Sequence, residues 1–306
     1  MCSDKDEIIR WKQQFFMGKM ITTIHRLLSH IVLLSKKTLI RVWFLFTKVY
    51  SFEKTIDIIL ESKKSVVRIG DGELKWIHGI SHAYEPYSIE MANELKKILF
   101  EKNKNVFLCI NPQMILKQTH KSNKTEKNYY NSLIKQHMSM YIKYVPRFRK
   151  YGNASITWIY RDYLSFSTDK LTNIYNGLKL VWDKKDVLIV EGSNVKFGLS
   201  NKMMDNARKV NRIICPDNNS FNIIEIIYDN IAKICNNYQI VLFALGPTAS
   251  ILVFKLASIE SRARFIDIGS LNEDYYCFLR DRCMLPVIDH DKTIEEYNKQ
   301  IVISLI

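Results

Sequence analysis

Two acidic side chains separated by a single glycine are the first feature of this sequence that could do chemistry. Asp71 and Glu73 stand in the segment Arg-Ile-Gly-Asp-Gly-Glu at positions 68–73. Carboxylate oxygens suit Mg²⁺ or Mn²⁺, and two of them leave coordination positions open for water and diphosphate oxygens. Arg68 could grip a phosphate, and the flanking glycines permit a sharp turn. The segment therefore predicts a divalent-cation site, unless its residues only cap a helix that begins near Glu73.

A second group of small and polar residues is the segment Glu-Gly-Ser-Asn at positions 191–194, with Lys196, Gly198 and Asn201 shortly after it. A small-residue loop between a strand and a helix can offer backbone N–H groups to a phosphate. The segment contains neither a G-x-x-x-x-G-K-[ST] motif nor a G-x-G-x-x-G motif. On these residues alone, an anion site and an ordinary turn both remain open.

Three more loops combine polar residues with glycine or proline, at positions 215–220, 245–250 and 267–275. In the second of them Thr248 could cap the following helix, whose free N–H groups would suit a phosphate or a nucleobase carbonyl. Simple capping between a strand and a helix explains the same residues without any ligand. The acidic residues of the third loop could bind a hydroxyl group or act as a general base.

Each of these loops follows a short apolar run, which indicates how the chain positions them. The runs are continuous rather than alternating, and helical stretches separate them, as is typical of parallel strands covered by helices. Ligands of such sheets bind at the carboxyl ends of the strands, where all these loops lie. The sequence thus predicts an α/β fold, with a mostly parallel sheet and helices on both faces. The expected strands are residues 65–69, 106–110, 187–190, 212–215, 240–244 and 265–268.

The first 60 residues differ from the rest, because apolar residues recur at helical spacing within a strongly basic segment. Between positions 8 and 50 there are eight Lys and Arg residues and no acid. A membrane span is not expected, because Lys36, Lys37 and Arg41 interrupt the best candidate, residues 30–50. Two interpretations of this basic amphipathic helical region, residues 1–60, remain open. It lies on an anionic membrane surface, or it forms a helical pair packed on the main domain.

The main domain is expected at residues 61–290 and a C-terminal tail at 291–306, with residues 117–163 as an insertion or lid. Six cysteines without a C-x-x-C pair, and no signal peptide, favour a cytoplasmic location, peripheral at the inner face of the cell membrane if the N-terminal region binds lipid. The net charge of +14 suits nucleic acid, anionic lipid or phosphorylated small molecules. We expect no nucleic-acid partner, because the chain shows no base-stacking aromatic motif.

Taken in order, the five loops resemble the bacterial GT-D-type glycosyltransferase family, long known only as a domain of unknown function. The family pattern begins with R-F-G-D-G-E and continues with V-E-G, R-I-I-C-P, L-G-P-T-A and D-I-G. The resemblance covers roughly residues 65–282, and the series is specific although each motif alone is not. The corresponding segments are RIGDGE at 68–73, VEG at 190–192, RIICPDNNSF at 212–221, ALGPTAS at 244–250 and IDIGSLNEDY at 266–275.

The resemblance implies a Rossmann-like sheet, a nucleotide-sugar donor that is most often a UDP-sugar, and Mn²⁺ or Mg²⁺ held by Asp71 and Glu73. It also implies a glycan or lipid-linked acceptor, in surface polysaccharide or glycoprotein biosynthesis. The acids considered for taking the acceptor proton are Glu191, Asp267, Glu273 and Asp274. The residues expected to bind the donor are Arg68, Gly70, Gly192, Lys196, Asn201, Pro216, Asn219, Gly246, Pro247 and Thr248.

The sequence departs from the family pattern mainly on the acceptor side. Lys196 stands where arginine is usual, and it keeps the charge without the bidentate fork. In the last motif Ser270 replaces a histidine and Asn272 replaces an acid. Asp274 replaces a glutamate, unless Glu273 shifts to take its place. Two other functions therefore remain open: a catalytically inactive nucleotide-sugar-binding module, and a different metal-dependent nucleotide phosphotransferase.

Overall fold

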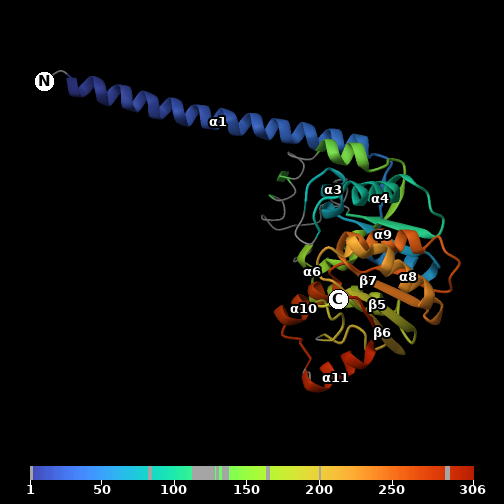
Figure 1. The fold of residues 1–306 in the computed structure, drawn as a ribbon. Coiled ribbons are helices and arrows are strands. Elements are labelled where there is room, and N and C mark those ends of the chain that lie inside the picture. The colour runs from blue at the N-terminus through green and yellow to red at the C-terminus, as the bar shows by residue number, and fades with distance from the viewer. Residues whose placement is uncertain are drawn as a thin grey trace.

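The fold is a single parallel sheet with helices on both faces, seen in a computed structural model (Figure 1). The structure describes residues 3–81, 85–111, 128, 131–132, 138–162, 166–199, 201–286 and 290–306, with side chains from residue 19 onward and, in the last segment, from residue 293. Within these ranges nine strands pair in the order β1-β4-β3-β2-β8-β7-β5-β6-β9, and every pairing is parallel. The predicted α/β fold is confirmed.

Six of the strands are those that the apolar runs predict. The central strand β7 is buried at every position, because helices cover both of its faces. The strands are β1 (Lys48–Val49), β2 (Ser65–Ile69), β3 (Val106–Ile110), β4 (Lys150–Asn153), β5 (Asp186–Gly192), β6 (Lys209–Cys215), β7 (Ile240–Ala244), β8 (Arg264–Asp267) and β9 (Ile301–Ser304).

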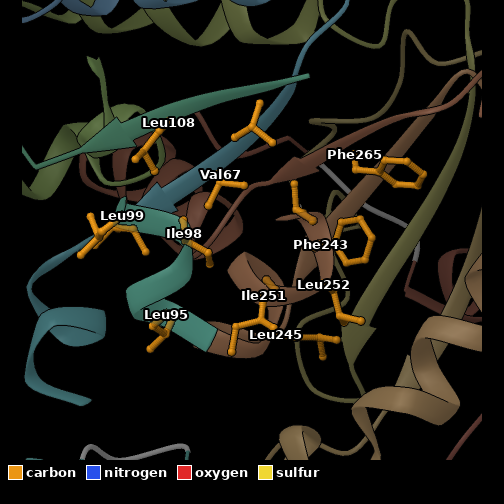
Figure 2. Close-up of a cluster of buried hydrophobic side chains, with 14 of the residues drawn as sticks. Val67, Leu95, Ile98, Leu99, Leu108, Phe243, Leu245, Ile251, Leu252 and Phe265 are labelled. Atoms are coloured by element: carbon orange, nitrogen blue, oxygen red, sulfur yellow. The ribbon is translucent and has the colours of Figure 1, made fainter. Parts of the chain in front are cut away.

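One face of the sheet is covered by α3 (Asp71–Ile77), α4 (Ile89–Phe100), α8 (Ile224–Ile234) and α9 (Gly246–Leu256). Figure 2 shows part of this core, where side chains of α4 and α9 meet those of β2, β3, β7 and β8. Within α9 the run Ile-Leu-Val at positions 251–253 is wholly buried, so this helix is held tightly and its first turn has a fixed position below the loop after β7.

The other face is covered by α2 (Phe52–Glu61), α7 (Thr168–Lys179) and α10 (Leu271–Asp281), with the short helix α6 (Ile159–Asp162) beside α10. Short 3₁₀ turns follow β4, β6 and α8, at Ala154–Thr157, Ser220–Ile223 and Cys235–Asn237. Helix α11 (His290–Gln300) leads into the edge strand β9.

Helix α1 (Ser3–Trp43) extends well beyond the sheet (Figure 1). Among its described side chains, Leu33 and Ile40 are buried, and Phe44 just after the helix is buried with them. Residues 19–32 are largely exposed. No helix in the described ranges has both the length and the apolar character that crossing a bilayer requires.

Three strands lie in segments where the sequence predicted no strand. Residues 150–153, inside the expected insertion or lid, form β4 between β1 and β3. Residues 301–304, inside the expected tail, form β9 at the sheet edge. Residues 48–49, inside the expected helical region, form β1. Strands β1 and β4 are short and contain Lys, so their sequences carry little of the apolar signal that marks a buried strand. Strand β9 is apolar, but it lies at the sheet edge and is only partly buried. The basic cluster at residues 117–127 lies outside the described residues.

Candidate active site

A pocket of about 1490 Å³ lies at the carboxyl edge of the sheet. Its lining comes from all five loops that the sequence singled out, after β2, β5, β6, β7 and β8, together with the segment after β4. The expectation that these loops share one rim of the sheet is therefore confirmed. The strands bring them together because parallel strands place all their carboxyl ends on the same side.

Asp71 and Glu73 both line this pocket, at the first and third positions of α3. Glu73 Oε2 accepts a hydrogen bond of 2.6 Å from the backbone N–H of Gly70, which caps the helix. Asp71 Oδ2 lies 3.2 Å from Nζ of Lys75 one turn later. Burial raises the pKa of Glu73, with the nearby Arg68 opposing the shift. Glu73 therefore caps its own helix and also lines the pocket.

The chemistry of these two side chains fits a divalent cation. Among the described residues, no three His, Cys, Asp or Glu side chains gather closely enough to form a metal site without other ligands. The protein would therefore contribute two carboxylates, and diphosphate oxygens and water would complete the shell, as is usual for Mg²⁺. Asp71 and Glu73 both line the pocket, so this pair of carboxylates could hold an ion there.

Arg68 lines the pocket from the end of β2. Its Nε donates a 2.9 Å hydrogen bond to the carbonyl of Ala154, and its Nη1 lies 3.4 Å from Oδ1 of Asp267. Asp267 is buried and also accepts from Ser250 Oγ at 2.8 Å and from the N–H of Gly269 at 2.9 Å. Asp267 thus orients Arg68 from below rather than facing the pocket itself.

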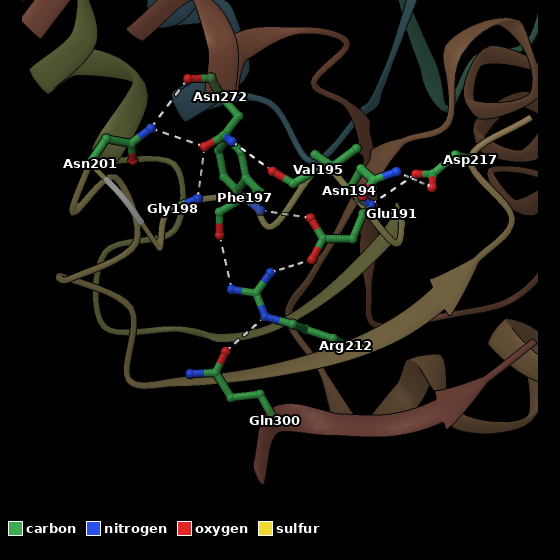
Figure 3. A network of polar contacts seen from close by, with 10 residues as sticks. All are labelled: Glu191, Asn194, Val195, Phe197, Gly198, Asn201, Arg212, Asp217, Asn272 and Gln300. Carbon is green, nitrogen blue, oxygen red and sulfur yellow. Dashed lines mark hydrogen bonds and ion pairs between the residues drawn. The ribbon is translucent and has the colours of Figure 1, made fainter. Parts of the chain in front are cut away.

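The loop after β5 is fastened to the loop after β6 by one carboxylate (Figure 3). Asp217 accepts hydrogen bonds from Ser193 Oγ at 2.5 Å, from the N–H of Asn194 at 2.9 Å and from its Nδ2 at 2.6 Å. Gly192 makes this approach possible, because a Cβ there would lie 2.6 Å from Oδ1 of Asp217. Lys196 follows with a φ of +45° and lines the pocket, as Gly192 does.

Glu191 lies beneath this loop in a buried network (Figure 3). Its Oε1 forms an ion pair with Arg212 and its Oε2 accepts from the N–H of Phe197 at 2.8 Å. Arg212 also donates to the Phe197 carbonyl at 2.9 Å and to Gln300 Oε1 at 2.8 Å. The network therefore shapes the backbone between β5 and Phe197 and connects it to the last helix.

Figure 3 also shows the contacts that join the loop after β5 to α10. Asn272 Oδ1 accepts from the N–H of Gly198 at 3.0 Å and from Nδ2 of the buried Asn201 at 2.9 Å, while its own Nδ2 donates to the Val195 carbonyl at 2.7 Å. Both groups of the amide at position 272, the oxygen and the nitrogen, are thus engaged within the protein. Asn201, predicted to bind the donor, instead supports the loop from behind and is absent from the described pocket lining.

Asp274 is also buried, and its carboxylate accepts from Tyr175 Oη at 2.7 Å and from the N–H groups of Tyr160 and Arg161 at 3.1 and 3.2 Å. Burial raises its pKa, as it does for Glu191 and Asp267. None of these three acids belongs to the described pocket lining. All three carboxylates hold other groups in place, and of the four acids considered for taking the acceptor proton only Glu273 belongs to the described pocket lining.

The other residues predicted to bind the donor fall into two groups, those that line the pocket and those that do not. Gly70, Gly246 and Pro247 line the pocket. Thr248 is buried at the start of α9 and donates to Glu85 Oε1 at 3.1 Å. Pro216 and Asn219 flank the lining residues of their loop but are not part of the described lining, and Asn219 has a φ of +58°. Thr248, Pro216 and Asn219 are thus placed to shape the walls of the pocket.

Several residues of the pocket were missed by the sequence analysis. Glu85 accepts from the N–H of Phe221 and from Thr248, both at 3.1 Å, and burial raises its pKa. Arg161 pairs with Glu273 at 2.6 Å and lies 4.4 Å from the centre of the Trp158 ring. Asp162 is another lining residue that the sequence analysis did not single out, and it accepts a hydrogen bond from Ser155 Oγ at 2.7 Å. The short helix after β4 carries no motif, so only recognition of β4 could have drawn attention to it.

A parallel sheet whose carboxyl-edge loops enclose two carboxylates, an arginine and a helix start is the arrangement of α/β proteins that bind nucleotides and other phosphorylated ligands. The model of the glycosyltransferase GT-D fold family matches residues 66–296. This match spans most of the chain, and the chain belongs to this family. The resemblance of the five loops is thereby confirmed.

Individual relatives agree with this assignment. The chain is 30% identical over 273 residues to "Probable glycosyl transferase Gly" of Streptococcus gordonii, and 26% identical over 233 residues to "Glycosyltransferase GlyD" of Streptococcus pneumoniae. These alignments cover 84% and 74% of this chain but only 39% and 27% of the two relatives. A solved structure described as "A New Glycosyltransferase (DUF1792) from Streptococcus sanguinis" is 27% identical, with a TM-score of 0.73, and the match covers 85% of this chain and 100% of that one.

Proposed function

We propose that this protein transfers a sugar from a nucleotide-diphosphate donor, with a UDP-sugar as the first candidate, to a glycan or lipid-linked acceptor. Surface polysaccharide or glycoprotein biosynthesis is the setting that we propose. The observation that carries the proposal is the convergence of the five family loops on one pocket that contains Arg68, Asp71 and Glu73. The free cysteines in the described ranges agree with a reducing, cytoplasmic location.

The donor side of the pocket is the basic side. Arg68 and Lys196 would contact the diphosphate, and the backbone at Gly192 lets that group approach closely. The first turn of α9, at Gly246 and Pro247, adds the partial positive charge of a helix N-terminus. Together these groups would favour the negative charge that builds up on the departing nucleotide.

Asp71 and Glu73 would hold Mn²⁺ or Mg²⁺ in the pocket. When bound, such a cation offsets the charge of the leaving group. Two contacts fix the positions of these carboxylates: the Gly70 N–H donates to Glu73, and Lys75 Nζ donates to Asp71. Glu73 Oε1 is not engaged by the Gly70 cap, which uses Oε2.

The acceptor side is the region around Glu273, the acid of the predicted set that does line the pocket. Its side chain is 59% exposed and pairs with Arg161, which itself lies over Trp158. We assign to Glu273 the uptake of the acceptor hydroxyl proton, and to the Trp158 face a contact with the sugar ring. Arg161 would hold the Glu273 carboxylate in place beside the acceptor.

A panel of nucleotide sugars, each tested with Mn²⁺ and with EDTA, addresses the proposal. Nucleotide release and donor binding are measured together. We expect cation-dependent release from one donor, and loss of both release and cation-dependent binding in the Asp71→Ala/Glu73→Ala variant. An unchanged response in that variant would refute the site. Tight binding without release would instead favour an inactive binding module, a candidate supported by the structural use of Asn272 where the family has an acid.

A further inference from the structure

Helix α1 carries a broad apolar face that no other described part of the chain covers. Its large side chains are about half to two-thirds exposed, for example 57% at Leu28, 58% at Ile31 and 64% at Val42. They recur three or four residues apart and so lie along one side of the helix. The exposed apolar face comprises Met20, Ile21, Ile24, Leu27, Leu28, Ile31, Val32, Leu34, Leu39 and Val42.

The side of α1 that contacts the rest of the protein is a different one. Leu33, Ile40 and Phe44, seven and four residues apart, are buried against the main domain. At 100° per residue these three positions fall opposite Ile24, Ile31 and Val42. The exposed apolar face therefore points away from the domain, so docking of α1 on the domain does not cover it.

The charge of this region limits what can cover the face. Eight Lys and Arg residues and no acid lie between positions 8 and 50. Just after the helix, the exposed Phe46 and Phe148 rings stack 5.8 Å apart, and the Arg147 guanidinium lies 3.8 Å from the centre of the Trp43 ring. Apolar and aromatic side chains bordered by cations are the composition that suits the boundary between lipid headgroups and acyl chains.

A second copy of the same helix fits less well. Positions 21, 24, 28, 31, 35, 38 and 42 have coiled-coil spacing, but the polar Ser35 and Thr38 occupy two of these seven positions. The flanking positions, where paired helices place opposite charges, hold Leu27, Val32 and Leu34 instead. Two such helices would also bring together like charges, with no acidic partner in either.

We propose that α1 lies flat on an anionic lipid bilayer, with its exposed apolar face in the headgroup–acyl boundary and a cation that borders this face, Arg41, at the lipid phosphates. The helix lies on the bilayer rather than crossing it, because it lacks an uninterrupted apolar stretch. This surface is separate from the pocket and does not depend on the proposed sugar transfer. Its consequence is that the sheet is held close to a membrane while the pocket stays outside the bilayer.

Co-sedimentation of the whole protein with vesicles tests the proposal. Vesicles of phosphatidylcholine alone are compared with vesicles that also contain phosphatidylglycerol, at low and at high salt. We expect binding to the anionic vesicles, weakened by salt because the Debye length shortens. Absence of binding to anionic vesicles, or equal binding to both kinds, would overturn the proposal.

Two variants separate the apolar and the charged parts. Leu28→Asp/Ile31→Asp should weaken vesicle binding more than about tenfold, and Arg41→Gln, which removes one cation at the border of the exposed apolar face, should weaken it about fivefold. Ile226→Asp on α8, where the side chain is 53% exposed, is the matched control and should bind as the wild type does. Unchanged binding in the first variant contradicts the proposal. A second result would also contradict it: the wild type binds no vesicles but self-associates in sedimentation velocity, and Leu28→Asp/Ile31→Asp abolishes that self-association. This result would identify a second copy of the chain as the occupant of the exposed apolar face.

Discussion

Arg68 lies against Gly269, in the space that a side chain at position 269 would fill. Gly269 has a φ of +45°, a conformation that glycine adopts without steric cost. The guanidinium is held on its other sides by the Ala154 carbonyl and Asp267. The position of Arg68 at the end of β2 thus depends on the absence of a Cβ at position 269, just after β8.

Replacing Gly269 by alanine should displace Arg68 and slow sugar transfer by about a hundredfold, since small shifts of a positioning group have effects of that size. The left-handed backbone should also cost about 1 kcal/mol in unfolding free energy. Initial rates of nucleotide release and urea unfolding measure the two effects. Gly177→Ala in α7, outside the described pocket lining, is the control, with an unchanged rate expected. Equal rates in both variants would show that Arg68 needs no such space.

The two roles of Glu73 can be separated by choice of substituent. Glutamine at the third helix position can still accept from the Gly70 N–H, so Glu73→Gln should keep the unfolding free energy within about 0.5 kcal/mol. Glu73→Ala removes the cap and should cost about 1 kcal/mol. Both should lose cation-dependent nucleotide release, measured with Mn²⁺ and with EDTA. If Glu73→Gln retained release, the cation would have to be held without this carboxylate.

Glu191 provides a test of positioning against catalysis. Glu191→Gln leaves Arg212 buried without its ion-pair partner, which should destabilise the fold by about 3–5 kcal/mol. A general base would instead contribute about 10²–10⁴-fold to the rate. We therefore expect a large fall in melting temperature and less than a hundredfold loss of rate, measured at a temperature where the variant is folded. Glu273→Gln should show the reverse: little change in stability, because the side chain is 59% exposed, and a large loss of rate.

The fold could be predicted from the sequence where apolar runs are continuous and end in turn residues. Strands β2, β3 and β7 were placed with the bounds that the structure shows. Strand β4 was missed because Lys-Tyr-Gly-Asn is not an apolar run, although pairing with β3 places it inside the sheet. Edge strand β9 alternates between partly buried and exposed residues, so its position depends on contacts with β6 that the local sequence does not encode.

The site was predictable in its loops but not in the roles of its acids. Asp71 and Glu73 were identified because the glycines beside them mark a turn at a strand end. Asp267 and Asp274 stand in an equally polar segment, yet both side chains point into the protein, where Ser250 and Tyr175 bind them. Burial of a carboxylate is decided by tertiary packing, and a single sequence does not distinguish a buried acid from an acid facing a pocket.

The buried carboxyl of Glu85 predicts a pH dependence of stability. Burial raises its pKa above the ordinary value of 4.5, although hydrogen bonds from Phe221 and Thr248 oppose the shift. The folded protein therefore holds this proton more tightly than the unfolded chain does. The stability that results is fully present below pH 4.5 and is lost as the pH rises through the folded-state pKa.

Glu85→Gln cannot titrate, so the unfolding free energy of the wild type minus that of the variant should be largest at acid pH and should shrink as the pH rises through this window. Urea unfolding at a series of pH values from about 4 to about 7 measures the difference. Glu90→Gln on the exposed side of α4 gives the baseline for removing one carboxylate. A difference that grows with rising pH would mean that the carboxylate of Glu85 is better stabilised in the folded protein than in water, through its contacts with the N–H of Phe221 and with Thr248.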